Sequence, residues 1–214
     1  MASFQTIEST ETKTENDKKY SSLASDEAIQ STMEALKKNG IEVYVFDSEE
    51  PLKKKLFELL PENAEVMNMK SQTLKTLGIS EVITNSGKYD SVRNKFKSLD
   101  LRSQRKIGSD ADYSVGSVHA VTENGEILIA SATGSQLSAY AYSSGKIIWI
   151  VGTQKIVKNR EEGFKRIYEY CFPLEDAAIR KLYNVGSKVG KILIINSESP
   201  GRLTLMFLKQ NIGF

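Results

Sequence analysis

The stretch SATGSQLSAYAYSSGKIIWIVGTQKIV, residues 131–157, carries the pattern that decides the fold. It begins with a turn of small residues and continues through a short helix-forming segment into an entirely apolar strand. It ends in a second loop that contains a glycine and a lysine. Turns, helices and apolar strands that follow one another in this way are typical of α/β proteins.

The alternation continues before this stretch. IEVYVF, residues 41–46, is too apolar for a strand with one face in water, so it is expected to be buried on both sides, as in a parallel sheet. SVGSVHAVT and EILIAS, which end at Thr122 and Ser131, flank the pair Asn124-Gly125 and predict a hairpin. Helices that alternate with apolar strands, plus one antiparallel hairpin, predict an α/β fold with a mixed-sheet three-layer sandwich.

Other segments carry simpler patterns. Residues 26–39 are expected to form a helix, because Ser25 can cap it and Gly40 can end it. A further helix is predicted over residues 88–99, and the polar residues 100–112 predict an irregular connector.

Length and composition fit one folded domain. With 214 residues, of which 40% are hydrophobic, the chain can bury a proper core. Residues 1–22 are rich in Ser, Thr, Glu and Lys, so they are predicted to be a disordered polar tail, and residues 23–214 a single α/β domain. The N-terminus lacks the apolar core of a secretory signal, and no apolar run approaches the roughly twenty residues that span a bilayer. We expect a soluble, cytoplasmic protein.

The charge balance does not favour binding to nucleic acids or membranes. Lys plus Arg total 29 and Asp plus Glu total 27, which gives a net charge of +2. The basic runs at residues 53–55 and 102–106 are short and typical of solvated surfaces. We therefore expect neither nucleic acid nor a membrane among the partners.

The chain contains one cysteine and one histidine. Zinc sites built on several cysteines and iron–sulfur clusters need more soft ligands, so neither a self-contained iron–sulfur cluster nor a metal site is expected. Redox chemistry would require a bound organic cofactor or a partner protein, and the sequence identifies no cofactor.

Two polar loops are the candidate ligand-binding elements. The first is formed by Thr133, Gly134, Ser135 and Gln136. It follows a predicted strand and precedes a helix, where free backbone N–H groups can bind an anion. An ordinary loop is an equal alternative, because neither GxxxxGK nor GxGxxG is present.

The second loop contains Gly152, Thr153 and Lys155, and it follows the strand KIIWIV. Ligands of open α/β sheets lie beyond the carboxyl ends of strands, so both loops are expected to face one pocket. Lys155 would then supply a charge to a phosphate or carboxylate. The alternative is an ordinary exposed lysine before a helix.

Two residues are candidates for acid–base chemistry. His119 alternates with apolar neighbours in SVHAV, which favours a hydrogen-bonded core or rim residue over a ligand. A histidine is nevertheless a ready acid or base near neutral pH. Glu123 begins the hairpin turn, and it is either a nucleophile or base in a dry pocket or a solvated turn residue.

Several of these stretches together resemble a known family. SVGSVHAVTENGEILIASATGSQ, IIWIVGTQKIV, RIYEYCFPLED and the closing GRLTLMFLKQNIGF are similar, in this order, to the LUD domain. This family is named for lactate utilization and includes the LutC and YkgG proteins. The resemblance covers most of residues 25–214 and is strongest from Asp112 onward. It implies an α/β fold similar to the sugar-phosphate isomerase and CoA-transferase superfamily.

The resemblance also implies partners and site residues. Family members work in, or are encoded beside, a system that oxidises L-lactate to pyruvate, whose electron carriers have cysteine-rich iron–sulfur motifs. With one cysteine, this chain resembles the accessory member, which implies iron–sulfur or oxidoreductase proteins as partners. In the related superfamily, anions bind at loops beyond strand ends and a glutamate often does covalent or base chemistry. By analogy, the two loops would hold an anion and Glu123 would be the acid or base. The family run resembling E-T-G-T-L reads ENGEI here, so its hydroxyl positions are absent.

Three functional hypotheses follow. In the first, a LUD-domain protein linked to lactate or organic-acid utilization binds a small anionic ligand at the loops after the strands 126–131 and 147–152. In the second, an enzyme acts on acyl or phosphate esters through Glu123. In the third, the protein is a non-catalytic accessory or regulatory subunit of an oxidation complex.

Overall fold

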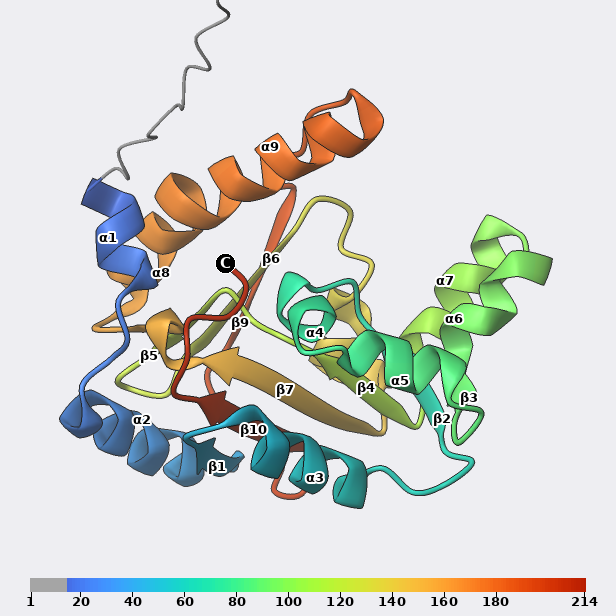
Figure 1. Ribbon diagram of the computed structural model, residues 1–214, viewed down its shortest axis with the longest axis horizontal. Helices are drawn as coiled ribbons and strands as arrows, with labels where there is room; N and C mark the ends of the chain where they lie inside the picture. Colours follow the sequence, from blue (N-terminus) through green and yellow to red (C-terminus); the bar gives the residue numbers. More distant parts are fainter. Residues whose placement is uncertain (1–14) are drawn as a thin grey trace, which may run out of the picture.

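The computed structural model describes residues 15–214, which form two β-sheets (Figure 1). The larger sheet has the order β1-β10-β7-β4-β2-β3, and every neighbouring pair is parallel. Its strands are β1 (Glu42–Phe46), β2 (Glu65–Asn68), β3 (Asp90–Ser91), β4 (Tyr113–Gly116), β7 (Lys146–Gly152) and β10 (Leu203–Leu208). The predicted α/β class is confirmed.

The smaller sheet has the order β8-β5-β6-β9. Its strands are β5 (Ala120–Thr122), β6 (Ile127–Ser131), β8 (Ile156–Val157) and β9 (Lys191–Ile195). The predicted hairpin is confirmed as the antiparallel pair β5–β6. The antiparallel pairs β5–β6 and β6–β9 lie in this second sheet, together with the parallel pair β5–β8, because SVGSVHAVT is not one strand. The chain leaves the large sheet after Gly116 and enters the small sheet at Ala120.

Both faces of the large sheet are covered, because side chains alternate along each strand. In β7, Trp149 belongs to the core shared with the small sheet, whereas Ile148 and Ile150 pack against helices on the other face. These helices are α3 (Glu49–Leu59), α4 (Gln72–Thr76) and α5 (Ile79–Asn85). β1 is an edge strand, so the expected burial of residues 41–46 on both sides is wrong: Glu42 is exposed.

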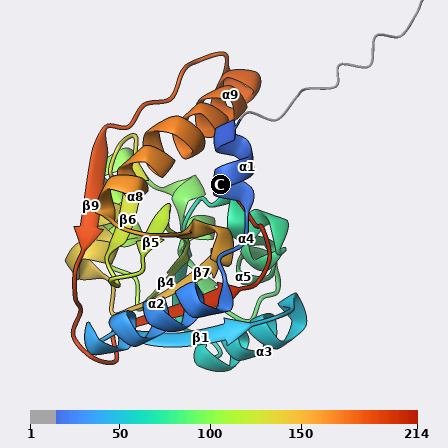
Figure 2. The same ribbon diagram turned by 90° about the vertical axis from the view of Figure 1, so that its left-hand side faces the viewer.

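Two further helices contact strands of the small sheet. Helix α2 (Asp26–Lys38) is confirmed, and the Ser25 hydroxyl accepts a hydrogen bond from the Ala28 N–H at 3.2 Å. Helix α8 (Arg160–Arg166) and the π-helical turn η4 (Ile167–Cys171) cover the outer face of the small sheet. Helix α9 (Phe172–Tyr183) continues from η4 and lies along the end of the molecule opposite α3 (Figures 1 and 2).

The prediction that residues 1–22 form a disordered tail is wrong for residues 15–21. Residues Glu15–Ser21 form helix α1, and its Tyr20 is buried against Tyr170 with ring centroids 5.8 Å apart. Lys19 also pairs with Glu162 at 2.5 Å. The Tyr20 ring and the Lys19–Glu162 ion pair thus hold α1 against the rest of the protein, although the polar composition of this helix does not predict packing. Residues 1–14 lie outside the described part of the chain.

The predictions for residues 88–112 are also corrected. The expected helix over residues 88–99 is divided into strand β3, helix α6 (Val92–Lys95) and the 3-10 turn η1 (Phe96–Ser98). The expected connector contains helix α7 (Leu101–Ser109). The Asp100 carboxylate caps α7 by accepting from the N–H groups of Arg102 and Ser103 at 2.8 and 3.0 Å. Capping by Asp100 favours α7 where hydrophobic periodicity gives a weak signal.

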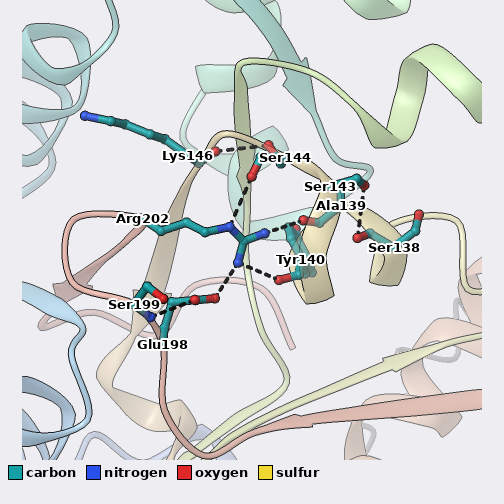
Figure 3. A network of polar contacts seen from close by, with 9 residues as sticks. All are labelled: Ser138, Ala139, Tyr140, Ser143, Ser144, Lys146, Glu198, Ser199 and Arg202. Atoms are coloured by element: carbon teal, nitrogen blue, oxygen red, sulfur yellow. Dashed lines mark hydrogen bonds and ion pairs between the residues drawn. The ribbon is translucent and has the colours of Figure 1, made fainter.

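A polar network fixes the π-helical turn η2 (Ala139–Ser143) against the large sheet. Figure 3 shows the Arg202 guanidinium donating to the carbonyl oxygens of Ala139, Tyr140 and Ser144 at 3.0, 3.2 and 3.1 Å, and to the Glu198 carboxylate. The turn holds the Tyr140 ring edge-on to the ring of Trp149, and the two ring centroids are 5.0 Å apart. A side chain at Gly116 would collide with the Tyr140 hydroxyl, so glycine is required there.

Candidate functional site

A cavity of about 600 Å³ lies where the two sheets meet. Its walls come from the segments after β2, β4 and β6, from the turn after β7, and from η4, α9 and the loop that leads to β9. The large-sheet strands β2, β4 and β7 are neighbours, and their carboxyl ends point to this region. Open α/β sheets bind ligands in this position.

Lys155 lies at the floor of the cavity and is 1% exposed. Its Nζ donates to the Thr73 hydroxyl at 3.1 Å, the Ser117 hydroxyl at 3.2 Å and the Val118 carbonyl at 3.2 Å. All three partners are neutral. Among the side chains that the structure describes, no carboxylate pairs with Lys155. A buried cation without a counter-ion is costly, and functional sites maintain such groups more often than cores do.

A second cation, Arg166, lies beside the cavity-lining residue His119, and its side chain is fully buried. Its Nη1 donates to the His119 carbonyl at 2.5 Å and contacts Cys171 Sγ at 2.9 Å. Its Nε and Nη2 have no hydrogen-bond partner within the described structure, and no ion pair involves it there. Arg166 and Lys155 therefore give this region a positive potential.

These charges and the burial of the site change its titration. Burial and, to a smaller extent, the charge of Arg166 together lower the pKa of Lys155 from 10.5 to about 7. Burial, together with the charges of Lys155 and Arg166, lowers the pKa of His119 to about 3. The Nδ1 of His119 accepts a hydrogen bond from the Ala130 N–H at 3.1 Å, as a neutral imidazole does. Lys155, not His119, is therefore the group that titrates near neutral pH.

The first predicted loop forms one rim of the cavity. Thr133, Ser135 and Gln136 line it, and Gly134 does not. The Gln136 Oε1 accepts hydrogen bonds from the hydroxyls of Ser131 and Ser135 at 3.2 and 3.3 Å. This arrangement places hydroxyl and amide groups beside the opening, where they can orient a polar ligand.

The second predicted loop contributes only its lysine. Thr153 is fully buried and does not line the cavity, nor does Gly152. A side chain at Gly152 would collide with Gln154 and with the carbonyl of Gln210, so this glycine allows close packing of the backbone. The 3-10 turn η3 (Thr153–Lys155) thereby directs the Lys155 side chain into the cavity.

Glu123 lies at the other end of β6 from the cavity. It occupies the hairpin turn before Ile127, where its N–H donates to the Val157 carbonyl at 2.9 Å, whereas the cavity rim begins at Ala130 and Ser131. At about 3.3 Å per residue, the strand separates the two positions by roughly 10 Å or more. The structure brings His119 to the cavity and leaves Glu123 outside it.

Several functional residues carry weak sequence signals. Thr73 and Ser117 hold Lys155 but come from segments that read as a short helix and the middle of a strand. Arg166 lies on the buried helical face of Gly163, Ile167 and Tyr170, and in the sequence only Ile167 and Tyr170 give an apolar signal for this face. Lys70 and Lys188 also line the cavity, so the charged side chains among its described lining residues are three lysines and Glu175.

The fold and this cavity define an α/β protein with a cationic pocket at its strand ends. The model of the LUD domain family matches residues 29–208, and the chain belongs to this family. A search of curated proteins finds no match. The crystal structure of a DUF162 family protein from Deinococcus radiodurans is similar in fold, with a TM-score of 0.55 and 11% sequence identity over 87% of this chain and 99% of that chain.

Two other solved structures show partial similarity. Ribose 5-phosphate isomerase from Plasmodium falciparum has a TM-score of 0.32 and 18% identity, and covers 53% of this chain and 55% of that chain. eIF2B beta from Chaetomium thermophilum has a TM-score of 0.30 and 14% identity, and covers 63% of this chain and 44% of that chain. Within residues 15–214, no helix combines the length and apolar character needed to cross a membrane.

Proposed function

We propose that this LUD-domain protein binds a small organic anion in the cavity, with the anionic group at Lys155. The observation that carries the proposal is the fully buried lysine at the cavity floor, held by Thr73, Ser117 and Val118 without a carboxylate. An anion at this point supplies the missing counter-charge and offsets the desolvation of the ammonium group.

Organic acids are the first ligand class to consider, and lactate utilization is the process we propose for the protein. The excess of lysines around the cavity attracts carboxylates and phosphates, and Gln136 and Ser135 can orient their neutral portions. A volume of about 600 Å³ exceeds the needs of a three-carbon acid and is typical of pockets for larger metabolites. Sugar phosphates and acyl-CoA compounds therefore belong in the same test. Glu123 lies outside the cavity and has no role in this proposal.

A thermal-shift panel tests the proposal with lactate, pyruvate, CoA, acetyl-CoA, nucleotides and sugar phosphates. A ligand present at about a hundred times its Kd should stabilise the folded protein by about 2.7 kcal/mol. We expect the stabilisation to be lost in Lys155→Met, because the side chain keeps its length and loses its charge.

Lys75→Met is the matched control, since Lys75 is an exposed lysine of α4 that does not line the cavity. It should retain the full shift. A hit that survives Lys155→Met undiminished would contradict the proposed position of the anion, and silence across the panel would contradict organic-anion binding.

A further inference from the structure

The hydrogen bonds of Lys155 suit a neutral amine as well as an ammonium group. An ammonium donates three N–H bonds, and a neutral amine donates two and keeps a lone pair. Two of the three partners of Nζ, the hydroxyls of Thr73 and Ser117, can rotate, and the third is the carbonyl of Val118. No carboxylate is among its described partners, so this set of neutral groups supplies no counter-charge that would favour the ammonium form.

The surroundings also protect such an amine from solvent. Lys155 is 1% exposed, and Val118 and Ile167 place apolar groups around the floor of the same cavity. Desolvated lysines of this kind serve proteins as nucleophiles toward carbonyl compounds. The other lysines of the cavity, Lys70 and Lys188, are exposed at its opening.

We propose that Lys155 is a covalent nucleophile that condenses with the carbonyl group of an anionic aldehyde or ketone bound in the cavity. The Nζ lone pair forms a bond to the carbonyl carbon, and the carbonyl oxygen becomes a hydroxyl group by taking one N–H proton. The second N–H proton leaves with this hydroxyl as water, and a carbon–nitrogen double bond remains. The step needs no oxidant or reductant, since an amine and a carbonyl give an imine and one water.

The proposal rests on the proposed function, because the cavity must first bind the anion. Within that function it names the ligand class: an acid or phosphate that also carries a free carbonyl. Lys155, whose pKa is lowered to about 7, has a large neutral fraction at physiological pH, whereas an ordinary lysine is almost wholly protonated there. The reactivity of Lys155 should therefore rise as the pH increases through 7.

Reductive trapping on the full-length protein tests this step. The protein is incubated separately with pyruvate, glyoxylate and glyceraldehyde 3-phosphate in the presence of sodium cyanoborohydride, which reduces an imine to a stable secondary amine. Peptide mapping by mass spectrometry then locates the adduct. We expect at least one of the three to label Lys155 about ten-fold or more above Lys70 and Lys188, because the lowered pKa of Lys155 leaves a large part of its amine neutral at pH 7. Lactate, which has no carbonyl, should give no adduct.

Two variants separate this inference from simple anion binding. Lys155→Arg retains a cation and should lose the adduct while keeping part of the thermal stabilisation by anions without a carbonyl. Lys75→Arg, at an exposed lysine of α4 that does not line the cavity, should keep the adduct. Absence of an adduct at Lys155 with all three probes, or labelling spread equally over exposed lysines, would overturn the inference. The wild-type peptide map decides this even where a variant fails to fold, and a positive thermal-shift panel would leave anion binding intact.

Discussion

Replacing Lys155 by methionine should remove about 2 kcal/mol of pH-dependent stability between pH 7 and pH 9. The pKa of Lys155 is about 7 in the folded protein and the ordinary value is 10.5, so the unfolded chain binds more protons in this window. Folded wild-type protein therefore becomes more stable as the pH rises, by up to about 1.4 kcal/mol per pH unit. Below pH 7 both states are protonated, and the full cost of burying the charge is present.

Urea unfolding of the wild type and of Lys155→Met at pH 7, 8 and 9 measures this difference. The two curves of unfolding free energy against pH should diverge, with the wild type gaining stability relative to the variant. Lys75→Met, at an exposed position of α4, should follow the wild type. Parallel curves for wild type and Lys155→Met would show that Lys155 keeps an ordinary pKa in the folded protein.

Replacing Arg202 by methionine should cost about 3 kcal/mol of unfolding free energy. The Arg202 side chain is 17% exposed and the Glu198 side chain 15%, so water replaces their contacts poorly. The variant loses charge-assisted hydrogen bonds to the carbonyls of Ala139, Tyr140 and Ser144 and leaves the Glu198 carboxylate without its ion-pair partner (Figure 3). Each such bond contributes about 1.5–3 kcal/mol, although the contributions do not add fully.

Urea unfolding at one pH measures the loss. Arg180→Met is the control, because Arg180 also pairs with a carboxylate four residues away, Asp176, but its side chain is 64% exposed. It should change stability little, as exposed pairs do. The double variant Arg202→Met, Glu198→Gln should recover part of the loss, since it removes the unpaired carboxylate. Equal effects at Arg202 and Arg180 would show that the network does not hold η2 in place.

Elements with a strong local signal were predictable from the sequence. The hairpin β5–β6 follows from one Asn-Gly pair, and β7 follows from an uninterrupted apolar run. The division into two sheets was not predictable, because Ser117 and Val118 continue the polarity pattern of a strand while the chain crosses between the sheets. Helix α1 also escaped prediction, since the burial of Tyr20 depends on a partner at Tyr170, far away in the sequence.

The candidate site was also predictable only where a local sequence pattern indicates it. A lysine after an apolar strand predicts a cation near a ligand, and Lys155 does line the cavity. Its complete burial depends on Thr73 and Ser117, which other segments bring to it. The lowered pKa of His119 likewise depends on its burial and on the charges of Lys155 and Arg166, which other segments of the chain bring to it.

The titration of Lys155 tests the central claim most directly. NMR spectra of protein with ¹³C-labelled lysine, recorded from pH 5 to pH 11, follow each lysine, and the signal missing from Lys155→Met identifies Lys155. We predict that this signal titrates near pH 7 in the free protein, because burial and Arg166 lower its pKa to about 7. A saturating anion without a carbonyl should move the titration to higher pH, since it stabilises the ammonium form. Titration of Lys155 together with the exposed lysines, unchanged by any ligand, would contradict a ligand site built on this residue.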